Sequence, residues 1–143
     1  MERRFHMMIY RLFHAQRSQL RREGAALGLG AGQPKLLSYL LVRGDCMQKE
    51  LAEYFEIDPA AVSRMLLSME RGGFITRDGA APRKRRGMVS LTEKGREAAL
   101  AWSDCGADFD RKLLQGFSEE ERALFADFLG RAYRNLRSGE DDS

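Results

Sequence analysis

The stretch "QKELAEYFEIDPAAVSRMLLSMERGGFITR", Gln48 to Arg77, decides the fold. Its opening residues, "QKELAEYF", predict a short helix that ends near Phe55. Asp58 followed by Pro59 is typical of an N-cap and a first helical position, and Gly72-Gly73 is typical of a helix end. We therefore expect a second, well-delimited helix over residues 58–71.

This second helix has two different faces. Its predicted buried face consists of apolar residues at helical spacing: Val62, Met65, Leu66 and Met69. The residues expected on the opposite face are Ala60, Ser63, Arg64 and Leu67. A helix with this pattern packs by one side and leaves the other side free to meet a partner.

After the two glycines, "FITR" and "MVSLT" are short β-type runs that predict a hairpin. Its tip holds four consecutive cations, Arg83, Lys84, Arg85 and Arg86. Taken alone, such a run also fits a solvated loop or a nuclear-type signal. Two short helices followed by a hairpin, however, form a winged helix-turn-helix, which leaves the second helix free to enter a DNA major groove. In that setting the basic tip is expected to contact DNA phosphates.

The candidate DNA contacts follow from this arrangement. Arginine can bond guanine O6 and N7 in bidentate fashion, serine can bond a base or a phosphate, and a small alanine permits close approach or contact with a thymine methyl. Two polar residues near the start of the first motif helix are either phosphate contacts or plain surface. The predicted DNA-binding residues are Gln48, Lys49, Ala60, Ser63, Arg64, Arg83, Lys84, Arg85 and Arg86.

The segments on either side are helical by pattern. Residues 5–20 predict an amphipathic helix with a basic back, Pro34 begins a helix that Gly44 ends, and Thr92 caps a long helix to about Leu114. Ser118 and Glu121 form a capping box before the last helix. The predicted fold is thus mostly α with a small β-hairpin wing. It divides into an N-terminal dimerisation helix (1–26), the winged helix-turn-helix (27–91), C-terminal dimerisation helices (92–138) and an acidic flexible tail (139–143).

The outer helices lack a partner within the predicted winged helix-turn-helix. Their apolar faces would bury each other across a two-fold axis, which would bring two recognition helices to successive major grooves. The predicted dimerisation residues are Phe5, Met8, Ile9, Leu12, Phe13, Leu124, Phe125, Phe128 and Leu129.

The Gln48–Arg77 stretch, followed at the right distance by "VSLTEKGREAAL", closely resembles the MarR family of bacterial transcription regulators. The resemblance covers about Leu27 to Leu100 by motif. It implies a homodimer with intertwined terminal helices that binds a pseudo-palindromic, double-stranded DNA operator near a promoter, usually as a repressor. Many members release DNA when a small ligand or an oxidant arrives, so a small-molecule effector is a further expected partner.

The sequence departs from the family pattern at two places. The family's wing usually reads Asp-Arg-Arg, with the aspartate bracing the second arginine, whereas here Arg83-Lys84-Arg85 occupies those positions. Arg85 matches the minor-groove arginine but has lost its acidic brace. On the recognition helix, Leu67 and Ser68 stand where polar or basic residues are common. An exposed Leu67 leaves room for a rival interpretation, a winged-helix module that binds protein and has no specific DNA recognition.

Composition excludes several other classes. The 143 residues carry a net charge of +3, and no apolar run approaches a membrane span, so a cytoplasmic protein without membrane contact is expected. There is no metal triad, nucleophile–base pairing or phosphate loop, so neither an enzyme nor a bound cofactor is expected. His6 and His14 lie without a ligand cluster, and Cys46 and Cys105 lack zinc-type spacing, so no metal site is expected.

Two questions stay open at this level. Cys46 or Cys105 would make the protein a redox sensor if its thiolate were accessible, but Asp45 should raise the pKa of the Cys46 thiol. Trp102, Tyr39 and Phe109 would line an effector pocket, although packing in the core is the simpler role for each. The effector itself cannot be identified from the residues.

Overall fold

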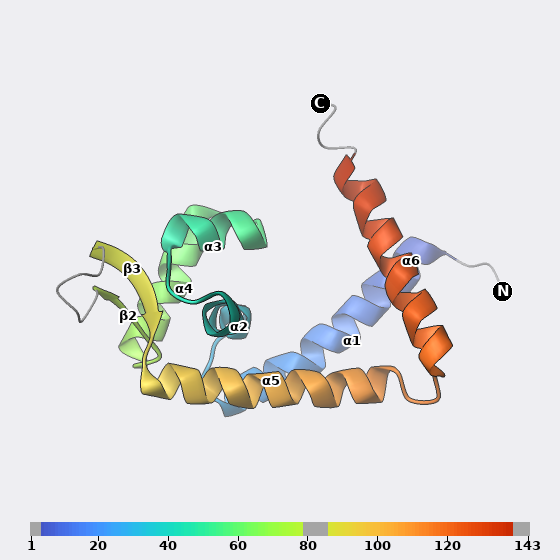
Figure 1. The fold of residues 1–143 in the computed structure, drawn as a ribbon, viewed down its shortest axis with the longest axis horizontal. Helices are drawn as coiled ribbons and strands as arrows, with labels where there is room; N and C mark the ends of the chain where they lie inside the picture. Colours follow the sequence, from blue (N-terminus) through green and yellow to red (C-terminus); the bar gives the residue numbers. More distant parts are fainter. Residues whose placement is uncertain (1–3, 79–85, 139–143) are drawn as a thin grey trace. The chain divides into compact units, whose positions relative to one another are not determined.

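The computed structural model describes residues 4–78 and 86–138 (Figure 1). The chain divides into two compact units, Met1–Ala107 and Asp108–Ser143, which are described separately. In chain order the elements are α1 (Phe5–Ala26), α2 (Gln33–Arg43), β1 (Cys46–Met47), α3 (Gln48–Phe55), α4 (Pro59–Arg71), β2 (Ile75–Asp78), β3 (Arg86–Leu91), α5 (Glu93–Leu113) and α6 (Glu119–Ser138). The mostly helical class with a small wing is thereby confirmed.

The helix-turn-helix comprises α3 and α4, and its local signals act as expected. Glu56 follows α3 in the left-handed region with φ of 54°, which turns the chain out of the helix. The Asp58 side chain then accepts a hydrogen bond from the Ala61 amide at 3.3 Å, and Pro59 occupies the first turn of α4. This cap satisfies one of the free amides at the helix start and fixes where the recognition helix begins.

The wing belongs to a three-stranded antiparallel sheet in the order β1-β3-β2. β2 and β3 pair with Ile75 opposite Leu91 and Thr76 opposite Ser90, with an irregularity before Asp78 pairs with Arg86. The short strand β1 pairs with β3 and was not predicted, because two residues show no alternation of apolar and polar positions.

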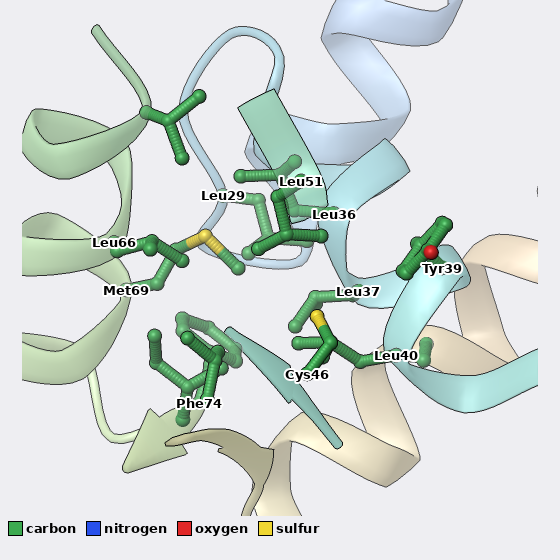
Figure 2. Close-up of a cluster of buried hydrophobic side chains, with 14 of the residues drawn as sticks. Leu29, Leu36, Leu37, Tyr39, Leu40, Cys46, Leu51, Leu66, Met69 and Phe74 are labelled. Atoms are coloured by element: carbon green, nitrogen blue, oxygen red, sulfur yellow. The ribbon is translucent and has the colours of Figure 1, made fainter. Parts of the chain in front are cut away.

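A single hydrophobic core joins α2, α3, α4 and the sheet. Its fully buried large side chains are Leu36, Leu37, Leu51, Leu66, Met69, Ile75, Val62 and Val89. Figure 2 shows Leu66 and Met69 of α4 directed toward Leu36 and Leu51. The predicted inward face of α4 is therefore correct, except that Met65 is only half-buried because it borders a cavity.

The start of α5 is fastened to the turn between α4 and β2. The Thr92 hydroxyl donates to the Gly73 carbonyl at 2.6 Å and accepts from the Gly95 amide at 3.0 Å, and the Thr92 amide donates to the Phe74 carbonyl at 3.1 Å. The Lys94 ammonium donates to the Gly72 carbonyl at 2.6 Å and lies 4.5 Å from the centre of the Phe74 ring. This set of contacts, which we call the α5 clamp, fixes the C-terminal end of the recognition helix.

The second unit contains the end of α5 and all of α6. The predicted capping box is present: the Glu121 amide donates to Ser118 Oγ at 3.1 Å, and the Ser118 amide donates to Glu121 Oε1 at 2.9 Å. Phe117 packs edge-on against Phe125, with ring centres 5.9 Å apart.

In the first unit, α1 is longer than the predicted 5–20 and continues to Ala26.

Candidate nucleic-acid interface

The outward face of α4 combines a cation with small side chains. Ala60 and Arg64 are exposed and Ser63 is half-buried, as the spacing predicted. Within the described part of the chain the Arg64 guanidinium has no carboxylate partner. An arginine held free on a helix face is available to bond a base edge or a phosphate.

The only acidic residue of α4, Glu70, is neutralised by a network that the sequence interpretation missed. Arg77 of β2 lies with its Nε 3.9 Å from Glu70 Oε2, and its Nη1 donates to Gln48 Oε1 at 3.4 Å. The Gln48 Nε2 in turn donates to the Pro59 carbonyl at 3.4 Å. The network links α3, α4 and the base of the wing, and it pairs the one carboxylate of α4 with a cation.

A signal for this network was present in the strand. Because side chains alternate along a strand, Arg77 shares a face with Ile75, which is fully buried. A cation on a buried face requires a partner, and Glu70 is the nearest acid before it in sequence. Gln48, expected as a DNA contact or plain surface, therefore lies inside this network with both ends of its amide engaged.

The remaining predicted contacts divide by location. Lys49 is highly exposed at the start of α3 and forms only a 3.8 Å surface pair with Glu53. Arg86 is the first residue of β3, where its backbone pairs with Asp78. Arg83, Lys84 and Arg85 of the basic tip lie outside the described residues. The wing is thus described at its base.

The predicted dimerisation faces are apolar and uncovered in the single chain. On α1, Phe5, Met8, Ile9, Leu12 and Phe13 are 43–66% exposed. Within α6, Leu124, Phe128 and Leu129 are exposed as well, and Phe125 is half-buried against Phe117. A continuous apolar face of this kind on a water-exposed helix marks an interaction surface.

A cavity of about 580 Å³ opens in the first unit. Its wall combines apolar and cationic side chains, among them Phe13, Arg17, Leu20, Lys35, Met65 and Trp102. Of the three aromatic residues considered for an effector pocket, Trp102 lines this cavity. Tyr39 lies instead in the core, where its hydroxyl donates to Glu50 Oε2 at 2.8 Å, and Phe109 belongs to the second unit.

Both thiols are held in their protonated form. Burial, together with the Glu50 and Asp45 carboxylates, raises the pKa of Cys46 to about 12. Burial and a hydrogen bond to Glu23, whose Oε2 lies 3.6 Å from the sulfur, raise the pKa of Cys105. Because the thiolate is the reactive species, neither environment suits a fast oxidant sensor.

Among the described residues no group of three or more His, Cys, Asp or Glu side chains is placed to hold a metal ion. No helix in the same part of the chain is long and apolar enough to cross a membrane.

Comparison with known proteins places this architecture. The MarR family model matches residues 29–79, which span α2 to β2. The HTH-type transcriptional regulator YdgJ of Bacillus subtilis (strain 168), itself uncharacterised, is 31% identical over 116 residues, covering 81% of this chain and 71% of the relative. The chain belongs to the MarR family.

Solved structures of MarR-family regulators share the fold over nearly the whole chain. The transcriptional regulator SlyA is 26% identical with a TM-score of 0.82, and the match covers 96% of each chain. A MarR-family regulator from Listeria monocytogenes, crystallised with a 26mer DNA, is 22% identical with a TM-score of 0.82, covering 96% of this chain and 92% of that one. This MarR-family protein is accordingly a winged-helix transcription regulator and not an enzyme.

Proposed function

We propose that this MarR-family regulator binds a pseudo-palindromic DNA operator as a homodimer and represses transcription until a small molecule or stress signal releases it. The single observation that carries the DNA-binding proposal is the outward face of α4. It presents Arg64 and Ser63 on a helix whose only carboxylate, Glu70, is paired with Arg77. Arg64 then bonds a base edge, Ser63 a base or phosphate, and Ala60 allows the close approach.

Further contacts in this proposal add affinity without sequence preference. Lys49 bonds a phosphate from the start of α3, and so does Gln48, whose Nε2 can exchange its long 3.4 Å bond to the Pro59 carbonyl for one to a phosphate oxygen. The tip cations Arg83, Lys84, Arg85 and Arg86 hold the adjacent minor groove and its backbone. Each phosphate that a cation neutralises releases counterions and steepens the salt dependence of binding.

The uncovered apolar faces support the homodimer. A second copy of the chain would cover Phe5, Met8, Ile9, Leu12 and Phe13 of α1 together with the exposed residues of α6. A symmetric dimer presents two equal recognition helices, which matches a palindromic site. Sedimentation of the wild type and of Phe13→Glu tests this step: a wild type that sediments as a monomer at micromolar concentration would contradict it.

The effector proposal rests on the cavity. Its apolar wall and its cations Arg17 and Lys35 suit a small, partly apolar molecule, and the cavity touches Met65 of the recognition helix. A ligand there would alter the position of α4.

Binding to the promoter region around its own gene tests the regulator. Fluorescence anisotropy of that duplex and of a scrambled duplex should give a specific complex whose log affinity falls steeply with log salt. Equal, weak binding to both duplexes would contradict specific recognition and favour a protein-binding module. Transcription from that promoter in vitro, with and without the protein, gives the sign of regulation.

A further inference from the structure

Leu67 is out of place on the recognition helix. Three other large apolar residues of α4, Val62, Leu66 and Met69, are 0% exposed in the core, and Met65 is half-buried beside the cavity, whereas Leu67 is 38% exposed. Single exposed leucines are common on protein surfaces and need no explanation by themselves. The surroundings of this one decide what it can contact.

Cationic and hydroxyl side chains surround Leu67 on the helix. Ser63 and Arg64 precede it by one turn, Arg71 follows by one turn, and all three positions share its side of α4. Arg64 and Arg71 are exposed, and the nearby Glu70 is paired with Arg77. Leu67 is therefore an apolar point between positive charges.

A DNA major groove complements that arrangement. Phosphates line both sides of the groove, and the thymine 5-methyl is the apolar group that a base pair presents on its floor. An apolar protein surface offers no anions for the two arginines, so burying Leu67 against it would also desolvate their charges. Charge complementarity favours DNA as the occupant of this face.

We propose that Leu67 selects a thymine in each operator half-site by packing against its 5-methyl group. The assignment rests on the proposed DNA-binding function and adds to it a specific base preference. A leucine side chain has no hydrogen-bonding group, so it distinguishes thymine only through the methyl. Its contribution should disappear when that methyl is removed and every hydrogen-bonding group of the base stays in place.

Deoxyuridine in place of thymidine makes that change. An operator is first selected from a random duplex pool, and each thymidine is then replaced in turn, symmetrically in both half-sites. Burying one methyl group is worth about a fourfold change in an equilibrium constant, so one replacement in both half-sites should weaken wild-type binding by about 10- to 20-fold. In Leu67→Ala the same replacement should cost little, and its selected sequences should lose the thymine preference at that position.

Val42→Ala serves as the matched control, because Val42 is an aliphatic residue of α2 that is 79% exposed and lies off the recognition helix. It should keep the full deoxyuridine penalty. A wild type with no penalty at any thymidine, or a penalty that persists in Leu67→Ala, would overturn the thymine contact while specific operator binding stands. Failure to select any operator would overturn the proposed function and this assignment with it. Because both substitutions are at exposed positions, the circular dichroism spectra of Leu67→Ala and Val42→Ala should match the wild-type spectrum.

Discussion

Replacing Gly95 by alanine should destabilise the protein, although alanine is the better helix former. Gly95 lies in the first turn of α5, and a Cβ there would overlap the Phe74 carbonyl oxygen. Helix propensity alone would favour alanine by about 1 kcal/mol. The backbone of the α4–β2 turn would have to move to make room, and that movement disturbs the α5 clamp.

The expected magnitude follows from the contacts that such a shift breaks. Overpacking against a backbone atom costs about 1–3 kcal/mol. The Thr92 bonds to the Phe74 and Gly73 carbonyls, at 3.1 and 2.6 Å, are each worth about 1 kcal/mol when lost. Subtracting the propensity gain leaves a net destabilisation of about 2–4 kcal/mol for Gly95→Ala.

Gly106 provides the matched control on the same helix. Apart from its chain neighbours and the backbone of its own helix, no described atom lies within 4 Å of the Cβ position at Gly106, so Gly106→Ala should gain about 0.5–1 kcal/mol. Urea unfolding followed by circular dichroism at one fixed protein concentration measures both variants, because the proposed dimerisation would make the midpoint depend on concentration. A Gly95→Ala protein as stable as the wild type, beside a stabilised Gly106→Ala, would refute the role given to the clamp.

Three further predictions concern the interface, the cap and the thiols. Arg77→Met should weaken operator binding about fivefold, because Glu70 then faces the phosphates unpaired. Adding Glu70→Gln to the same chain should restore most of the lost affinity, and no restoration would mean that Arg77 bonds DNA itself. Asp58→Ala should cost about 1 kcal/mol in urea unfolding through loss of the α4 cap, and an unchanged midpoint would disprove the cap's importance. Because the pKa of Cys46 is raised to about 12 and that of Cys105 is also raised, both thiols stay protonated at pH 7 and alkylation should accelerate only as pH rises. Peroxide should therefore leave operator binding of the wild type equal to that of Cys46→Ser with Cys105→Ser, and a release confined to the wild type would revive the redox sensor.

The helical part of the fold was predictable because its signals are local. Asp58 and Pro59, Gly72 and Gly73, and the Ser118–Glu121 box each bond within a few residues, so neighbouring letters suffice to place them. The strand β1 failed the same test because it exists only by pairing with β3, some forty residues later. The α5 clamp is non-local in the same way, because its residues are brought together only by the fold. Its one sign in the sequence is the glycine at position 95.

The site shows the same division. Spacing placed Ser63, Arg64 and Leu67 on the outward side of α4, since a helix face depends only on its own period. Which charges on that face stay free depends on Arg77, a residue of another element, and spacing along α4 carries no information about it. The pKa of the Cys46 thiol was predicted in the right direction from Asp45, but burial and Glu50 are larger causes than that neighbour.

The network at Glu70 bears on the missing acidic brace of the wing. Where the family's pattern has an aspartate at the tip, this chain has Arg83, so a cation there has lost its partner in the sequence. At the base of the same wing, Arg77 joins β2 to Glu70 of α4 and to Gln48 of α3. An acid on the recognition helix thus holds the base of the wing through its strand β2. Two expected results depend on the pairing of Arg77 with Glu70. One is the restored operator binding of the Arg77→Met, Glu70→Gln double variant, and the other is the salt dependence of wild-type operator binding.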